Sequence, residues 1–157
     1  MQIGIIGQGF VGNAVYQKFK KYYNIKTYDI KSKLSTSTEQ EVLDNDIIFI
    51  CLPTPMNKDG SCYTGIVETA IKRVFEFGVA KTVVIKSTVP PGTTSKWNKQ
   101  FKSLDVVFNP EFLTEANAVS DYENQTRIIL GGPRKSTTKL KPIFKKAFPN
   151  ADIIKTD

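Results

Sequence analysis

The residues with the clearest potential for chemistry are three glycines near the start of the chain, Gly7, Gly9 and Gly12. They stand between an apolar run, Ile3 to Ile6, and a stretch with helical spacing. In such a unit the first glycine permits a tight turn, the second lets a pyrophosphate approach the backbone, and the third lets helix and strand pack closely. The phosphates would face the free N–H groups at the start of the helix. The pattern predicts a dinucleotide site, and its plainer interpretation is a structural turn.

An acidic residue, Asp29, follows about 20 residues later, at the end of Ile25 to Tyr28. A carboxylate at this distance would meet the ribose hydroxyls of an adenosine, and it favours NAD over NADP because it would repel a 2′-phosphate. Phe10 and Val11 lie inside the glycine motif and are assigned with it to the cofactor site. Taken alone, Phe10 is most simply a packing residue.

Two threonines follow predicted strands. Thr54 stands between two prolines after the run Asp46 to Leu52, and Thr88 follows Lys81 to Lys86. Each is either a rigid loop or capping residue or a contact to the cofactor. The Pro90-Pro91-Gly92 sequence would hold the second loop stiffly, which suits a site.

Glu111 and Glu115 are four residues apart in a segment, Glu111 to Val119, that could be helical, so on a helix they would share one face. They form either an exposed acidic surface or a carboxylate base with its neighbour at the mouth of a site. The chain contains no histidine, so acid or base chemistry would fall to carboxylates, lysines or cysteines.

The bulk properties narrow the class of protein. The 157 residues include 40% hydrophobic residues, enough for one domain spanning residues 1–157. Cys51 and Cys62 match no metal spacing and are expected to be reduced thiols, Cys51 in the core. We expect a cytoplasmic protein with no membrane span, since neither a signal peptide nor a long apolar run is present. The net charge of +7 comes from scattered lysines, which indicates a solvated surface and makes nucleic acid an unfavoured partner.

The elements that must position these residues alternate between strands and helices. Predicted strands are Ile3 to Ile6, Ile25 to Tyr28, Asp46 to Leu52, Lys81 to Lys86, Asp105 to Phe108, Arg127 to Leu130 and Ala151 to Ile154, and predicted helices include Glu39 to Leu43, Tyr63 to Phe77, Ser95 to Phe101 and Ser136 to Phe148. This order indicates an α/β fold with a doubly wound parallel sheet of the Rossmann type. Ligands on such sheets bind beyond the carboxyl ends of the strands, where all the loops above would meet.

Taken together, these loops resemble the NAD-binding domain of the UDP-glucose/GDP-mannose dehydrogenases. The similar blocks cover nearly the whole chain in order: Gly7-Gln8-Gly9-Phe10-Val11-Gly12, Pro53-Thr54-Pro55-Met56 with Asp59-Gly60, Lys86-Ser87-Thr88-Val89-Pro90-Pro91-Gly92-Thr93, Asn109-Pro110-Glu111-Phe112-Leu113-Thr114-Glu115 and Arg127-Ile128-Ile129-Leu130-Gly131.

The resemblance implies oxidation of the C6 alcohol of a nucleotide sugar to a carboxylate with two NAD in succession. It implies cofactor contacts for Gly7, Gly9, Gly12 and Asp29, and places Thr54, Thr88 and Glu115 near NAD. Glu111 would correspond to the carboxylate that, with Thr88, directs water onto a covalent thioester. A carboxylate whose pKa is raised by partial burial could activate water in this way.

The family's nucleophilic cysteine, its assisting lysine and asparagine, and its sugar-nucleotide domain would all lie beyond Asp157. We therefore expect NAD binding with little or no sugar turnover from these residues alone, and a nucleotide-sugar substrate only when a C-terminal half completes the site. Alternatives are a catalytically silent NAD-binding or sensing module, and a small dehydrogenase of another alcohol or hydroxy acid with Glu111 or Lys86 as base. The sequence leaves the oligomeric state open, and a homo-oligomer is compatible with it.

Overall fold

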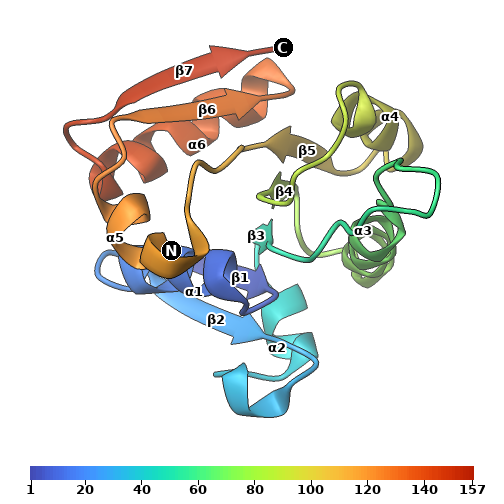
Figure 1. Cartoon of the computed structure of the whole chain (residues 1–157), viewed down its shortest axis with the longest axis horizontal. Helices are drawn as coiled ribbons and strands as arrows, with labels where there is room; N and C mark the ends of the chain where they lie inside the picture. The colour runs from blue at the N-terminus through green and yellow to red at the C-terminus, as the bar shows by residue number, and fades with distance from the viewer.

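A computed structural model describes all 157 residues and shows one seven-stranded sheet between two layers of helices (Figure 1). The strands are β1 (Gln2–Ile6), β2 (Asn24–Tyr28), β3 (Ile47–Ile50), β4 (Thr82–Ile85), β5 (Asp105–Phe108), β6 (Arg127–Gly131) and β7 (Asp152–Thr156). The helices are α1 (Phe10–Phe19), α2 (Glu39–Leu43), α3 (Gly65–Phe77), α4 (Thr93–Gln100), α5 (Ala118–Glu123) and α6 (Arg134–Ala147), with 3-10 turns η1 (Ser32–Leu34) and η2 (Glu115–Asn117). None of the helices has the length and apolar character needed to span a bilayer.

The strand order creates the place for a ligand. The order is β2-β1-β3-β4-β5-β6-β7, with β1 to β5 all parallel. The chain goes from β1 to β2 on one side of β1 and then crosses to β3 on its other side. The connection that follows β1 and the connection that follows β3 therefore lead to opposite sides of the sheet. In doubly wound sheets a crevice forms at this switch point, beyond the carboxyl ends of the strands. The expected α/β fold of the Rossmann type is confirmed.

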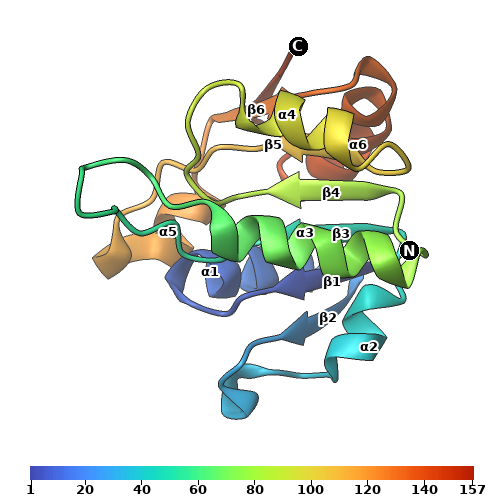
Figure 2. The same cartoon turned by 90° about the vertical axis from the view of Figure 1, so that its right-hand side faces the viewer.

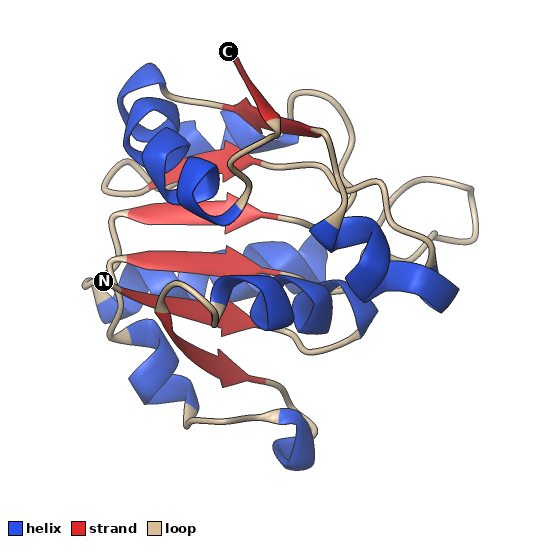
Figure 3. Cartoon of the chain, turned by 90° about the vertical axis from the view of Figure 1, so that its left-hand side faces the viewer, coloured by secondary structure: helices blue, strands red, loops and turns tan.

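Both faces of the sheet are buried, as the continuous apolar strands require. Ile47 and Phe49 belong to the core packed under α1, α5 and α6 (Figure 3), whereas Ile48 and Ile50 belong to the core under α2, α3 and α4 (Figure 2). Successive side chains of a strand point to opposite faces, and parallel sheets covered on both faces therefore carry uninterrupted apolar runs.

The sheet is not parallel throughout, because β6 runs against β5. These two strands meet only at Phe108 and Gly131, and β7 then pairs parallel to β6. The link between β5 and β6 holds one six-residue helix, α5, which lies at the carboxyl edge of the sheet (Figure 2). Such a helix is only about 9 Å long. The link between β5 and β6 does not return the chain to the amino edge of the sheet. Strand β6 therefore begins at the carboxyl edge and runs antiparallel to β5.

The expected helix at Glu111 to Val119 is wrong over its first half. Residues 111–114 are irregular, and only a 3-10 turn at Glu115 precedes α5. The N–H groups of this segment are bonded to side chains instead of helical carbonyls: Leu113 donates to Glu111 Oε2 at 2.6 Å, and Thr114 donates to Asp121 Oδ2 at 2.8 Å. Glu111 and Glu115 therefore do not share a helix face.

The register of the strands aligns the residues that follow them. Ile6, Ile50, Ile85 and Phe108 are successive partners across the sheet. The residues after them continue the ladder by one step, with N–H to O distances of 2.8 to 2.9 Å from Cys51 to Ile6, Lys86 to Ile50 and Asn109 to Ile85. Gly7, Cys51, Lys86 and Asn109 thus form a row along the carboxyl edge, over which a ligand can lie.

Candidate functional site

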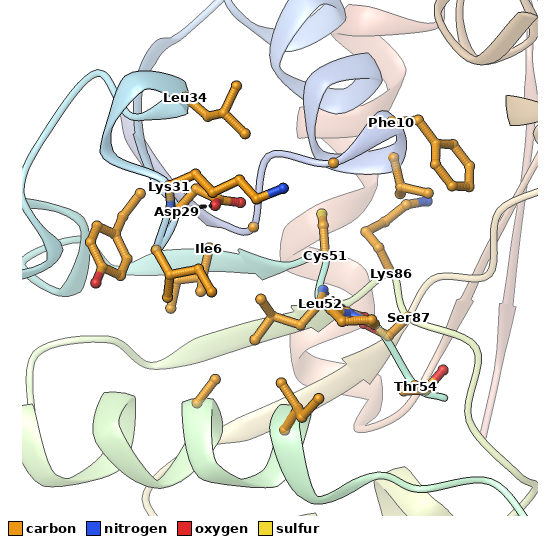
Figure 4. Close-up of a pocket in the computed structure, with 18 of the residues that line it drawn as sticks. Ile6, Phe10, Asp29, Lys31, Leu34, Cys51, Leu52, Thr54, Lys86 and Ser87 are labelled. Atoms are coloured by element: carbon orange, nitrogen blue, oxygen red, sulfur yellow. Dashed lines mark hydrogen bonds between the residues drawn. The ribbon is translucent and has the colours of Figure 1, made fainter. Parts of the chain in front are cut away.

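A cavity of about 700 Å³ opens over the carboxyl edge at the β1/β3 switch point (Figure 4). It is lined by the segments that follow the five strands β1 to β5 and by residues of α2 and α3. Eight of the residues predicted from the sequence line it: Gly7, Gly9, Phe10, Val11, Asp29, Thr54, Thr88 and Glu111. The other two, Gly12 and Glu115, do not. Figure 4 shows Asp29 and Lys31 at one end, Thr54, Lys86 and Ser87 at the other, and Cys51 between them.

The glycine loop has the shape that the motif predicts. Gly7 has φ +94°, and a Cβ on Gly12 would lie 1.9 Å from the Gly7 carbonyl oxygen, so loop and helix can approach only with glycine there. Gly12 therefore shapes the site without lining it. A Cβ on Gly9 would meet no atom within 4 Å.

The start of α1 is free to hold an anion. Gly9 is the N-cap of α1, no side chain caps the helix, and its first turn has no acidic residue. The first N–H groups of a helix have no partner within it and carry its positive dipole end. Open space over Gly9 together with these donors fits a pyrophosphate.

Asp29 is fixed opposite the glycine loop. Its Oδ2 accepts the Gln8 N–H at 2.7 Å and its Oδ1 accepts the Lys31 N–H at 2.8 Å. A carboxylate offers about four lone-pair sites, so acceptor capacity is left for ribose hydroxyls. The carboxylate is thereby aimed before any ligand binds.

The residues that form the walls of the pocket around Asp29 were not identified from the sequence. Lys31 and Leu34 line this end of the pocket, and Arg73 of α3 forms an ion pair with Glu39 of α2 across it. The side chain of Arg73 is 56% exposed. The sequence predicted that Arg73 lies on a helix, but it did not show which face of the sheet that helix covers, so it could not place Arg73 in the pocket.

At the other end, Thr54 and Thr88 are brought together. Thr54 Oγ1 donates to the Thr88 carbonyl at 2.7 Å. Ser87 makes a second tie: its Oγ donates to the Leu52 carbonyl at 2.6 Å and accepts the Leu52 N–H at 3.1 Å. The loops after β3 and β4 are thus held as one unit beside the cavity.

The two glutamates separate. Glu111 is half-buried and lines the pocket, with its carboxylate accepting the Leu113 N–H. Glu115 is exposed on η2, outside the pocket lining. A base or water-directing role is geometrically open to Glu111 alone, and the contact of Glu115 with a cofactor stays a prediction.

Two pocket residues had other interpretations in the sequence. Cys51 was expected in the core, but it is only half-buried and lies in the pocket floor, and desolvation raises the pKa of its thiol to about 12. Lys86, considered only as an alternative base, is 1% exposed and lines the same pocket. Burial lowers the pKa of Lys86 to about 8.

The arrangement offers helix N–H groups for an anion at the glycine loop and hydrogen-bond acceptors for hydroxyl groups at Asp29. It offers hydroxyl and carboxylate groups but no ready thiolate, because a thiol with a pKa of about 12 is protonated at neutral pH.

Comparisons with known proteins agree with this description. Residues 17–148 match a model of the UDP-glucose/GDP-mannose dehydrogenase family, NAD binding domain. A UDP-glucose 6-dehydrogenase of Bacillus subtilis is 35% identical over 83% of this chain and 28% of that protein, and one of Streptococcus pneumoniae is 28% identical over 99% and 46%. A UDP-glucose dehydrogenase structure from Pyrobaculum islandicum superposes with a TM-score of 0.85 at 24% identity, covering 99% of this chain and 46% of that one. The chain thus spans half or less of the length of these relatives.

Proposed function

This chain belongs to the UDP-glucose/GDP-mannose dehydrogenase family, and from that premise we propose that residues 1–157 form a single NAD-binding domain that serves as the cofactor half of a nucleotide-sugar 6-dehydrogenase. The family match confirms the family and NAD as its cofactor. The finer assignment concerns which residues hold NAD and what the domain achieves with it.

The observation that carries the proposal is the convergence of separate loops on one cavity. The glycine loop after β1, Asp29 after β2, Thr54 after β3 and Thr88 after β4 are far apart in sequence, and all line the same space. A pocket of a few hundred Å³ or more with a few convergent polar groups is the usual form of a small-molecule site.

Each part of the pocket has a distinct task in this proposal. The open N–H groups over Gly9 hold the pyrophosphate, and Asp29 accepts the adenosine ribose hydroxyls. NAD, when bound, supplies a hydride acceptor. Thr54, Thr88 and Glu111 then flank the end of the pocket at which that acceptor would meet a sugar alcohol, and Glu111 would hold or direct a proton or water there.

The test of NAD binding is isothermal titration with NAD+ of the wild type and of Asp29→Ala. Hydrogen bonds to a charged group contribute about 1.5 to 3 kcal/mol each, so the variant should bind at least about tenfold more weakly. Asp152→Ala is the matched control, because Asp152 is exposed on β7, away from the pocket lining. Wild type that fails to bind NAD+, or equal affinity in the Asp29 and Asp152 variants, would refute the assignment.

Sugar oxidation is the second part of the proposal. The one cysteine in the pocket, Cys51, is a poor nucleophile because of its raised pKa, so residues 1–157 alone should produce no NADH from UDP-glucose or GDP-mannose. Adding a separately expressed C-terminal half of a relative should start NADH production, which absorbance follows. NADH formed without that half would contradict the division of labour.

The same inert thiol also favours a second candidate, a catalytically silent NAD-binding module. Tight NAD+ binding with no NADH production in the presence of any C-terminal half would select this candidate over the first.

A further inference from the structure

A buried cation lies at the end of the pocket opposite Asp29. Lys86 is the residue after β4, its side chain is 1% exposed, and it lines the cavity together with Cys51 and Glu111 (Figure 4). Fully buried lysines are rare unless they are paired. No ion pair of Lys86 within 4 Å is present among the salt bridges of the chain.

The ammonium group is held in place by a chain of hydrogen bonds. Lys86 Nζ donates to Asn109 Oδ1 at 2.8 Å, and Asn109 Nδ2 donates to the Ile129 carbonyl at 2.8 Å. The Nζ atom also lies 5.2 Å from the centre of the Tyr122 ring. An ammonium carries three N–H donors, and Asn109 engages one. The others are on a group fixed at the pocket lining.

The ionisable groups around Lys86 come from three elements. They are Cys51 after β3, Glu111 after β5 and Tyr122 on α5. Burial raises the pKa of both the Cys51 thiol and the Tyr122 phenol, so both stay neutral well above neutral pH. Glu111 is the acidic neighbour, and its interaction with Lys86 favours the charged lysine, while burial opposes it.

The position of this cation matters because the two redox forms of a nicotinamide differ in charge. The oxidised ring carries a positive charge and the reduced ring is neutral. With the adenosine at Asp29, the nicotinamide half belongs at the Lys86 end. Like charges repel strongly where water is displaced, since the effective dielectric constant is lower there.

We propose that the buried ammonium group of Lys86 lets the pocket distinguish the redox forms of its dinucleotide, holding NADH in preference to NAD+. The proposal rests on the proposed function, since it assumes that a dinucleotide occupies the pocket with its adenosine at Asp29. Lys86 is then a specificity-determining residue. The carboxylate of Glu111 attracts the positively charged oxidised ring, whereas Lys86 repels it. Removal of the lysine charge therefore leaves a site that favours NAD+.

The test compares dissociation constants of NAD+, NADH and ADP for the wild type, Lys86→Met and Lys81→Met. Methionine is an unbranched, uncharged side chain of nearly the same length as lysine, and Lys81 is an exposed lysine just before β4. The ratio of the NAD+ constant to the NADH constant should fall about tenfold in Lys86→Met and stay unchanged in Lys81→Met. ADP lacks the nicotinamide half, so its affinity should be the same in all three proteins.

A pH series on the wild type provides a second reading that needs no variant. The ratio should fall as the pH rises from 7 to 9.5, because Lys86 loses its charge near pH 8 and repulsion of NAD+ ends. In Lys86→Met the ratio should not change with pH.

The outcomes separate the two proposals. If none of the three ligands binds the wild type, the proposed function and the inference both fall. If NAD+ and NADH bind but their ratio is the same in wild type and Lys86→Met, the inference alone is overturned. Should Lys86→Met fail to fold by circular dichroism, the wild-type pH series decides, and a flat ratio contradicts the inference.

Discussion

The two ends of the pocket are built from different kinds of contact. At the Asp29 end the polar groups are in contact with solvent: Asp29 is half-buried and bonded to backbone N–H groups, and Arg73 and Glu39 form an ion pair whose arginine is exposed. At the opposite end the groups are buried and tied across loops, as Lys86 and Ser87 are. Solvent screens charges at the first end, whereas burial sets the ionisation of groups at the second.

This difference has a functional consequence. Asp29, a half-buried carboxylate with free lone pairs, can accept hydroxyl groups. The buried end holds a lysine whose pKa is lowered to about 8, and the half-buried Cys51 next to it carries a thiol whose pKa is raised to about 12. Recognition of the ligand can therefore reside at one end, and sensitivity to the charge of the ligand at the other.

The largest expected effect that tests the difference between the two ends of the pocket is the low reactivity of Cys51. In a Cys62→Ser background, Cys51 should react with iodoacetamide at pH 8 about a thousandfold more slowly than a small free thiol, because only the thiolate attacks. Mass spectrometry of the alkylated protein over time gives the rate. A rate close to that of the small thiol would show that the buried end does not suppress ionisation.

A pair of glycine substitutions separates the shaping of the pocket from its contact with ligand. Gly12→Ala places a methyl group 1.9 Å from the Gly7 carbonyl oxygen, which should cost about 3 kcal/mol of folding free energy. Gly9→Ala places its methyl group in open space, so its melting curve should match wild type while NAD+ affinity falls. Denaturant unfolding and titration measure the two quantities. Equal unfolding curves for Gly12→Ala and wild type would show that the loop does not require the third glycine.

The smallest effect is expected from the exposed ion pair. Arg73→Met removes the partner of Glu39 at the surface, and exposed pairs contribute at most about 1 kcal/mol. Both stability and NAD+ affinity should therefore change little, by less than about fivefold in affinity. Glu39→Gln should have the same small effects on stability and NAD+ affinity as Arg73→Met. A loss of more than tenfold in NAD+ affinity would mean that Arg73 contacts the ligand directly and that Asp29 does not dominate binding at its end of the pocket.

The sequence was sufficient for the fold class and for placing the glycine loop and Asp29 at one pocket, because both follow from local signals. Apolar runs predicted the strands, and the glycine spacing before α1 with an acid about 20 residues later predicted Gly7, Gly9 and Asp29 at one site. The glycines are needed for steric reasons that hold wherever the same turn occurs.

The rest depended on contacts between distant segments. Nothing local showed that Asp121 would bond the Thr114 N–H group and that Glu111 would lie outside a helix. The direction of β6 depends on where α5 packs. The positions of Lys86 and Cys51 could have been predicted from the sequence. Each lies two residues after a core residue on the face covered by α1, Val84 for Lys86 and Phe49 for Cys51. Because side chains alternate between the two faces of a strand, both point to that same face at the edge of the sheet.

The most direct test of the account is amide chemical-shift mapping by NMR of the 157-residue chain with ADP and then with NAD+. The central claim is that one dinucleotide spans both ends of the pocket. ADP should shift the amides of Gly9 to Gly12 and those around Asp29, and NAD+ should add shifts at Lys86 to Thr88. The claim is contradicted if NAD+ produces no shifts beyond those of ADP, or if its shifts fall on α6 and β7 instead of the pocket.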